Sequence, residues 1–292
     1  MLLQQLTNGL MLGSTYALVA IGYSLIFGVL RLLHLAHGEV FMVGAFAGLI
    51  VVLWFSLGPF AAVFGGLVVA GILGIILELV AFRPIRRRGD NYLAPIVSSV
   101  GAGLVLQEVM TKLFGAEQQG FPRQFAGAVY DLGIISITST QIFIIVVAFA
   151  SMIALHLFVT RSRLGVAIRA TSENLEIASI LGINVDFVIM LTFAIASALG
   201  GIAGVLVGLN FNAVSPFMGI DMATKGMAIM LIGGLGSIYG AMAGGLLLGV
   251  GEVLSVAYLA SSYRDAFAFG LMIIVLLLRP RGLFATGIGE AR

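Results

Sequence analysis

The first thirty residues of the chain, Met1 to Leu30, contain no charged side chain. The same pattern recurs along the sequence, where long apolar runs end in short clusters that are rich in arginine. Hydrophobic residues make up 60% of the chain and charged residues 10%, whereas a soluble domain has about 25% charged residues. A globular core cannot bury this much apolar surface. The sequence therefore predicts a protein that crosses a membrane several times.

The runs are apolar on all sides, which favours helices over the alternating strands of a membrane β-barrel. A bilayer core of about 30 Å requires about 20 apolar residues per helix. We predict an all-α polytopic membrane protein that forms a single transmembrane domain over residues 1–292. Its eight predicted membrane segments are residues 8–30, 40–57, 60–82, 93–110, 141–160, 187–209, 224–253 and 266–278.

The segment 224–253 is rich in glycine, and its centre reads GGLGSIYG over residues 233–240. Each glycine costs a helix about 1 kcal/mol relative to alanine. We therefore predict two short helices that meet at a break, or a re-entrant pair. Breaks at membrane depth occur where they line a cavity or are buried in protein, which makes Gly233, Gly234, Gly236 and Gly240 candidate pathway or helix-break residues.

A second polar segment, residues 31–39, follows the first predicted span and contains two histidines, a glycine and a glutamate. It is either a short connecting loop or a helix interruption that shapes a pathway. The sequence leaves both interpretations open. His37, Gly38 and Glu39 are the candidate residues here.

Three clusters of arginine, in residues 83–88, 161–169 and 279–281, set the orientation. Cytoplasmic loops of membrane proteins collect Lys and Arg, so all three clusters are predicted to face the cytoplasm. The N-terminus then lies outside, and residues 112–140 form an external loop. The net charge of +2 has the same origin, and no nucleic acid partner is expected. The absence of cysteine excludes disulfides and thiolate metal sites.

The sequence lacks the motifs of a phosphate-binding loop, a zinc protease and a serine hydrolase. We predict no catalytic residue and no metal site, which makes a membrane-embedded enzyme the least favoured class. A proton-driven carrier usually needs a carboxylate near the membrane midplane. The acidic residues are instead predicted to lie at or within about two turns of span ends, where their carboxylates reach the interface: Glu39, Glu78, Glu108, Asp221 and Glu252.

The loop 161–186 contains a short amphipathic segment. Thr171 or Ser172 is predicted to cap a helix with acidic residues in its first turn, where the helix dipole favours them, and Gly182 is predicted to end it. Ile177, Ala178 and Leu181 would form its apolar face. Such a helix at a cytoplasmic turn is typical of a docking element, and the alternative is a helix that lies on the lipid headgroups.

Five stretches of the chain resemble LivH-type permease subunits of bacterial high-affinity branched-chain amino acid ABC importers. They are NGLMLGSTYAL at 8–18, AHGEV at 36–40, RSRLG at 161–165, ASILGIN at 178–184 and GGLGSIYG at 233–240. The resemblance extends from about Gln5 to Phe284, which is nearly the whole chain.

This resemblance implies a multi-pass permease domain in the bacterial cytoplasmic (inner) membrane that moves leucine, isoleucine and valine. It implies a second related permease subunit, two cytoplasmic ATPase subunits that use ATP and Mg, an external substrate-binding protein, and no cofactor in this chain. The segment 169–182 corresponds to the coupling element of the family. The candidate coupling residues are Arg169, Thr171, Glu173, Asn174, Glu176, Ala178, Leu181 and Gly182.

Two alternatives remain open at this point. One is an ABC permease for another small solute, such as urea or a short amide, because selectivity can reside in a different polypeptide. The other is a stand-alone secondary carrier or channel, which would work without ATP.

Overall fold

The computed structural model describes residues 1–88, 93–122, 127–131, 133 and 135–284. Eight of its helical segments are long and apolar enough to cross a membrane, which confirms the predicted fold class. They are α1 (Leu2–Leu30), α2 (His37–Phe55), α3 (Pro59–Leu77) with its continuation to Arg88, α5 (Ala94–Phe114), α6 (Ser139–Arg161), α9 (Val185–Phe211), α11 (Ile238–Tyr258) and the segment Ser261–Leu278.

Shorter elements join these helices. The π-helix η1 (Glu78–Phe82) and α4 (Arg83–Arg88) extend α3, whereas α7 (Arg163–Glu173) and α8 (Leu175–Ile180) connect α6 to α9. The last span consists of a 3₁₀ turn, η3 (Ser261–Tyr263), and α12 (Arg264–Leu278). Strands β1 (Val129–Asp131) and β2 (Ser136–Thr138) pair antiparallel between α5 and α6.

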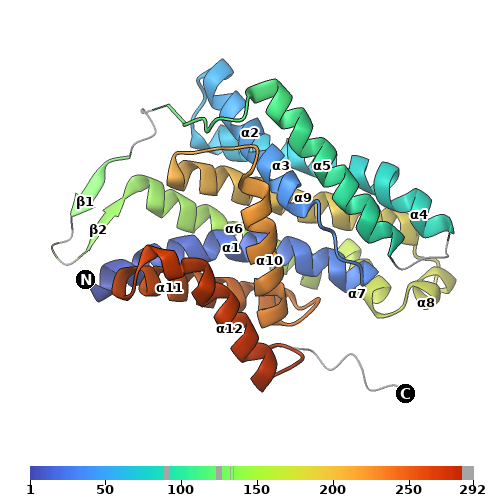
Figure 1. Ribbon diagram of the computed structural model, residues 1–292. Coiled ribbons are helices and arrows are strands. Elements are labelled where there is room, and N and C mark those ends of the chain that lie inside the picture. The colour runs from blue at the N-terminus through green and yellow to red at the C-terminus, as the bar shows by residue number, and fades with distance from the viewer. Residues whose placement is uncertain (89–92, 123–126, 132, 134, 285–292) are drawn as a thin grey trace.

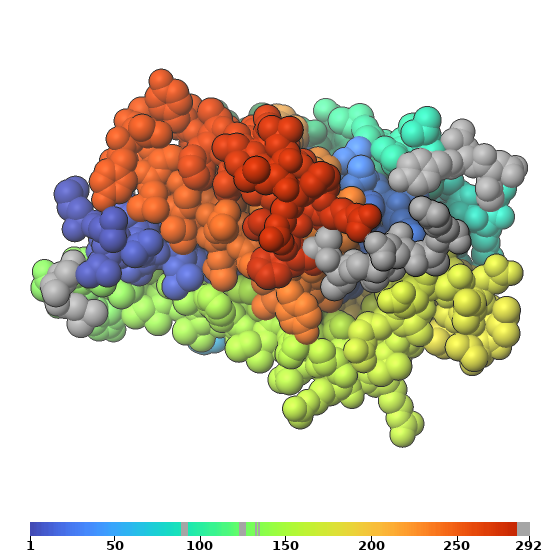
Figure 2. Space-filling view, turned by 90° about the horizontal axis from the view of Figure 1, so that it is seen from below, coloured from blue at the N-terminus to red at the C-terminus, as the bar shows by residue number. Residues whose placement is uncertain are grey.

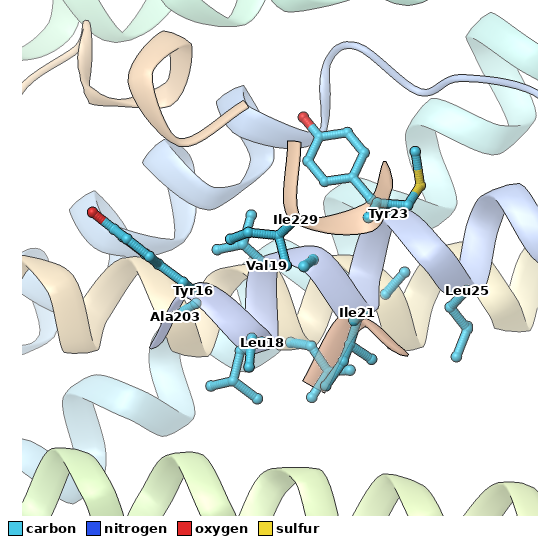
Figure 3. Packing of buried hydrophobic residues seen from close by; sticks show 14 of the residues in the cluster. Tyr16, Leu18, Val19, Ile21, Tyr23, Leu25, Ala203 and Ile229 are labelled. Atoms are coloured by element: carbon cyan, nitrogen blue, oxygen red, sulfur yellow. The ribbon is translucent and has the colours of Figure 1, made fainter. Parts of the chain in front are cut away.

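Helix α1 lies at the centre of the bundle, between α9 and α11 (Figure 1). Its side chains between Tyr16 and Ile26 are all buried, whichever way they point. This explains why the segment is apolar all round, because a helix without a polar face must be enclosed by protein or lipid. Figure 3 shows Tyr16, Ile21 and Tyr23 of α1 in this core, beside Ile229 and Ala203 from other helices.

Glycines allow α1 and α11 to lie almost backbone to backbone. A Cβ on Gly249 would collide with the backbone of Gly13, and one on Gly245 would come within 2.5 Å of the Ala17 backbone. Small residues spaced by four on one helix face are known to permit this approach. The regularly spaced glycines of α11, among them Gly245 and Gly249, therefore form the surface that packs against α1.

The glycine-rich region forms two helices, α10 (Met218–Gly233) and α11, and the chain turns between them at residues 234–237. Helix α10 runs steeply across the direction of α1 and α9 (Figure 1). The predicted break is present, but the prediction that both helices are short is wrong for α11, whose 21 residues are long enough to span a membrane. The reason is that its glycines pack against α1 and therefore do not interrupt it.

The two ends of the bundle differ. At one end, the β1–β2 hairpin meets the start of α1, where the Gln4 side chain exchanges two hydrogen bonds with the Ser136 backbone at 2.9 and 3.0 Å. The other end contains α4, α7 and α8 (Figure 1). Both α4 and α7 contain arginines in their sequences. The rule that cytoplasmic segments collect arginine predicts that the end with α4, α7 and α8 faces the cytoplasm, and we call it the cytoplasmic end on that basis.

The last described residues return to the cytoplasmic end of α10. The backbone N–H groups of Leu283 and Phe284 donate to the carbonyl oxygens of Ile232 and Gly233 at 2.8 and 3.0 Å. Helix termini leave carbonyls without intrahelical partners, and here a segment fifty residues further along the chain supplies them. Figure 2 shows α11 and α12 side by side over one face, with α6 and α7 along its edge.

Candidate functional site

The predicted docking loop forms two consecutive helices, α7 and α8, at the cytoplasmic end. The predicted cap at Thr171 or Ser172 is wrong, because α7 continues to Glu173 and both hydroxyls donate back to carbonyls within it, at 2.8 and 2.7 Å. The cap of α8 is Asn174, whose Oδ1 accepts from the N–H groups of Glu176 and Ile177 at 2.9 and 3.0 Å.

Gly182 follows α8 with a φ of 83°, a left-handed conformation that favours glycine. Its N–H donates to the Ser179 carbonyl, and the N–H of Ile183 reaches back to Ala178. The backbone groups that end α8 are therefore satisfied locally, as in other glycine-terminated helices.

Helix α8 exposes an apolar patch made of Ile177, Ile180 and Leu181, which are 55%, 78% and 72% exposed. Ala178 was predicted on the same face but is buried. Glu173 and Glu176 are exposed beside the patch. Arg169 is exposed on α7, and its guanidinium donates a long hydrogen bond of 3.5 Å to the Thr160 carbonyl. These three large apolar side chains, two on α8 and that of Leu181 directly after it, lie outside the spans and are suited to contact with another protein.

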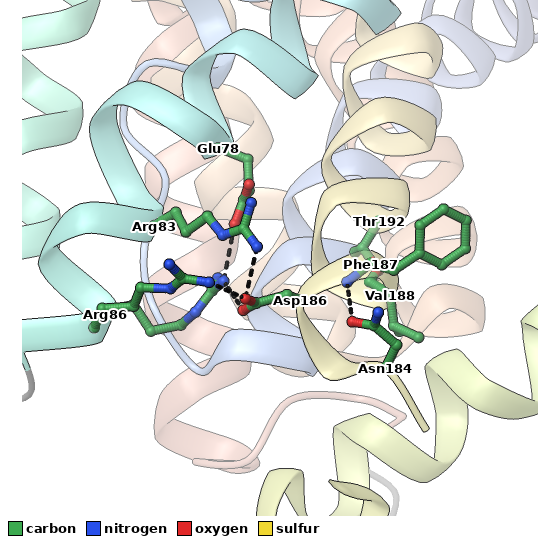
Figure 4. Close-up of polar contacts among 9 residues, drawn as sticks. Glu78, Arg83, Arg86, Asn184, Asp186, Phe187, Val188 and Thr192 are labelled. Atoms are coloured by element: carbon green, nitrogen blue, oxygen red, sulfur yellow. Dashed lines mark hydrogen bonds and ion pairs between the residues drawn. The ribbon is translucent and has the colours of Figure 1, made fainter. Parts of the chain in front are cut away.

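An ionic cluster ties the start of α9 to α4 (Figure 4). Asp186 accepts hydrogen bonds from Arg83, Arg86 and Arg87 at 2.7, 2.7 and 2.8 Å. Arg86 also donates to Glu78, a fully buried carboxylate of the π-helix η1, at 2.9 Å. Asp186 lies four residues after Gly182, so the cluster connects the segment that follows α8 to α4 and, through Glu78, to η1 at the end of α3.

The segment before α2 interrupts the helical path inside the bundle. His34 and His37 are fully buried, and their ring centroids lie 5.8 Å apart. His34 packs against Phe82 and Phe193 at 5.0 and 5.3 Å, and its ring nitrogens have no hydrogen-bond partner among the described residues. The interruption is thus enclosed by protein, as irregular backbone at membrane depth must be.

Gly38 and Glu39 bring α2 against α10. A Cβ on Gly38 would collide with the Gly219 carbonyl, and the Glu39 carboxylate lies directly over Gly219. The prediction that Glu39, Glu78 and Glu252 reach the membrane interface is wrong, because all three are buried. Their carboxylates point into the bundle, which a span-end position in the sequence does not reveal.

The four candidate glycines of the second break lie where α10 meets α11. Gly233 and Gly240 pack so closely that a Cβ on either would collide with the backbone of the other. Gly234 and Gly236 adopt positive φ values of 109° and 78° in the turn, and Gly236 lies against Gly28 near the end of α1. The turn is therefore compact and tightly packed, and it lies at the cytoplasmic end.

Sequence reasoning missed a buried ionic cluster around Glu252. This carboxylate is fully buried and accepts hydrogen bonds from Lys225 at 2.8 Å and from the Tyr16 hydroxyl at 3.2 Å. It also forms an ion pair with Arg264, whose Nε lies 2.6 Å from Glu252 Oε1. Lys225 lies 3.4 Å from Asp265 as well. The cluster joins α1, α10, α11 and α12 inside the bundle. Among the described residues, no group of three or more His, Asp or Glu is placed to hold a metal ion.

The comparisons with known proteins agree with one another. The family model described as the permease component of branched-chain amino acid transport systems matches residues 5–276. LivH of Escherichia coli (strain K12), a high-affinity branched-chain amino acid transport system permease protein, is 39% identical, with 96% of this chain and 94% of LivH aligned. LivM, a permease protein of the same description and organism, is 27% identical over 92% of this chain and 67% of LivM.

One solved structure resembles the fold. PsaBC from Streptococcus pneumoniae in complex with Fab aligns with a TM-score of 0.50 at 15% identity, over 94% of this chain and 91% of that chain. At this identity the likeness concerns the fold alone.

Proposed function

This chain belongs to the family of permease components of branched-chain amino acid transport systems, and from that membership we propose that it forms half of the pathway of an ATP-driven importer for leucine, isoleucine and valine. It is a transport subunit and not an enzyme. The pathway would be completed by a second related permease subunit, as the existence of both LivH and LivM in one organism suggests.

The observation that best supports this proposal is the exposed apolar patch on α8. It lies at the cytoplasmic end, outside the membrane spans, and is followed directly by the cluster of Asp186 with three arginines. This is the arrangement that a chain needs if an external motor drives it: a contact surface and a rigid connection from that surface to the spans. We assign the patch to one of two cytoplasmic ATPase subunits.

ATP and Mg would be used by these partner subunits, since this chain carries no phosphate-binding loop. Closure of the ATPase pair would displace α8, and the Asp186 cluster would transmit the movement to α3 and α4. The close glycine contacts of α11 with α1 permit sliding with little side-chain interlocking. The transporter would lie in the cytoplasmic membrane of a bacterium. An external binding protein would deliver the substrate at the end of the bundle that carries the β1–β2 hairpin.

The test is reconstitution. The chain is co-expressed with the companion permease, ATPase subunits and binding protein that its organism supplies, and the complex is placed in proteoliposomes. We expect leucine uptake that requires two components. ATP must be present on the side of the membrane that carries the ATPase subunits, and the binding protein must be present on the opposite side. Uptake by this chain alone under an ion gradient would refute the proposal in favour of a carrier, and ATP-driven uptake of urea or a short amide without leucine would refute the substrate assignment.

A paired substitution tests the docking patch. Ile180→Asp places a charge in the patch and should abolish co-purification of the ATPase subunits. The control is Val129→Asp on the hairpin, an apolar residue of similar exposure (66%) at the opposite end, which should retain them. Equal retention by both variants would refute the assignment of the patch.

A further inference from the structure

A cavity opens at the cytoplasmic end of the bundle, separate from the α8 patch. Its volume is about 510 Å³, within the range of roughly 300–1,000 Å³ that is typical of small-molecule sites. Its walls come from α1, α6, α7 and the turn between α10 and α11. Figure 1 shows how these four elements converge at this end of the bundle.

The lining has the character of a binding site for an aliphatic molecule. Leu25, Val29, Val159, Ile168 and Ile238 provide branched apolar surface, and most of these side chains are themselves buried. Burial of aliphatic carbon against such a surface is favourable by about 25 cal/mol per Å². A short branched chain would therefore be retained better than a polar solute.

Ser24 supplies a polar group within this apolar wall. It is fully buried, lines the cavity, and its hydroxyl has no hydrogen-bond partner among the described residues. A buried hydroxyl without a partner costs about 1–3 kcal/mol, so an occupant that hydrogen-bonds to it gains affinity. Ser14, another fully buried serine of α1, has by contrast a partner in the Met11 carbonyl at 2.8 Å.

The charge of the cavity selects the sign of the ligand. Arg169 lines it, and none of the described lining residues is an aspartate or a glutamate. The Arg169 guanidinium makes one long hydrogen bond of 3.5 Å, to the Thr160 carbonyl. Arginine forms bidentate, charge-assisted hydrogen bonds with carboxylates. An anion with a carboxylate is therefore favoured, and a cation is disfavoured.

We propose that this cavity is a cytoplasmic binding site for a small branched aliphatic carboxylate, whose occupancy restrains α7 and slows transport. The ligand would join Ser24 of α1 to Arg169 of α7, and α7 leads directly into the α8 patch. A branched-chain amino acid that accumulates in the cell and its deaminated 2-oxo acid share this chemistry. The effect on transport rests on the proposed function, whereas binding to the cavity does not.

The binding test uses the intact transporter complex in lipid nanodiscs without the binding protein. Radiolabelled 4-methyl-2-oxopentanoate is the probe, with leucine and leucinamide as competitors. We expect saturable binding, competition by leucine, and competition at least roughly tenfold weaker by leucinamide, because the amide lacks the carboxylate that the arginine binds. Preferential displacement by leucine or by unlabelled oxo acid identifies which of the two is the better ligand.

Two variants locate the site. Ser24→Ala removes an unpartnered hydroxyl, so the fold should be unaffected while the probe binds about three- to tenfold more weakly. Arg169→Gln should weaken binding by tenfold or more. Ser14→Ala is the matched control and should bind the probe normally. Absence of saturable binding, unchanged affinity in both Ser24→Ala and Arg169→Gln, or a tightly held phospholipid that the probe does not displace would overturn the proposal.

The transport arm separates the two proposals. Proteoliposomes are loaded with the oxo acid or with leucine on the cytoplasmic side, and the ratio of uptake rates with and without loading is measured. We expect the ratio to fall well below one and to return toward one in Ser24→Ala. Uptake that is insensitive to loading overturns the regulatory role alone. Absence of any leucine uptake refutes the proposed function, and the binding arm still decides whether the cavity is a site.

Discussion

Removing the Glu252 carboxylate should destabilise the bundle far more than removing any one of its partners. In Glu252→Leu, the cations of Lys225 and Arg264 lose a fully buried counter-ion, and breaking a buried pair in this way costs about 3–5 kcal/mol. In Lys225→Met, Glu252 keeps Arg264, so the loss is closer to one charged hydrogen bond, about 1.5–3 kcal/mol. For a chain of this size each kcal/mol lowers Tm by roughly 2 °C.

The assay is thermal denaturation of the detergent-solubilised protein, followed by loss of the monodisperse peak in size-exclusion chromatography. We expect a decrease in Tm of roughly 6–10 °C for Glu252→Leu and roughly 3–6 °C for Lys225→Met. The double variant, Glu252→Leu with Lys225→Met, should be no less stable than Glu252→Leu. It removes Lys225, which is the more buried of the two cations that lose their counter-ion. Asp265→Asn is the control, since Asp265 is 68% exposed and such pairs contribute about 0–1 kcal/mol.

Two results would refute this reasoning. One is a Glu252→Leu variant whose Tm equals that of the Asp265→Asn control. The other is a double variant whose loss of stability equals the sum of the two single losses, since independent sites add whereas members of one network do not.

Three further predictions concern the coupling elements and the glycine packing. Asp186→Asn should leave leucine-independent ATP hydrolysis intact but lower uptake per ATP several-fold, because α9 loses its connection to three arginines; unchanged stoichiometry would contradict the transmission route. Asn174→Ala should cost α8 about 1 kcal/mol and weaken ATPase co-purification, while Asn174→Asp, which keeps the cap, should restore it. Gly249→Val should separate α11 from Gly13 and prevent accumulation of folded protein, in contrast to Gly270→Val, whose added Cβ meets open space.

The spans were predictable because hydropathy is a local property. The predicted segment 187–209 lies two residues inside each end of α9, and the N-terminal segment ends at the same residue as α1. Each of these helices must present apolar side chains in every direction, so a continuous apolar stretch of the sequence indicates where it begins and ends. The glycine signal at 233–240 likewise marks a turn, since positive φ at Gly234 and Gly236 is a local requirement.

The ionic clusters were not predictable for the opposite reason. Lys225 and Glu252 are 27 residues apart, and Arg83 and Asp186 more than one hundred, so each pair exists only because two helices pack in one particular register. A carboxylate near a span end looks the same in the sequence whether it reaches water or turns inward. The cap of α8 was misplaced because the extent of α7 decides which polar residue lies outside the helix.

The return of Leu283 and Phe284 to the end of α10 has a consequence for biogenesis. Those two residues satisfy carbonyls of Ile232 and Gly233 that were synthesised fifty residues earlier. While the chain is still being synthesised, these two carbonyls lack the hydrogen bonds from Leu283 and Phe284 that complete the cytoplasmic end of α10. Because Leu283 and Phe284 follow α12 in the chain, these two hydrogen bonds can form only after α12 has been synthesised, and this end of the bundle is completed last.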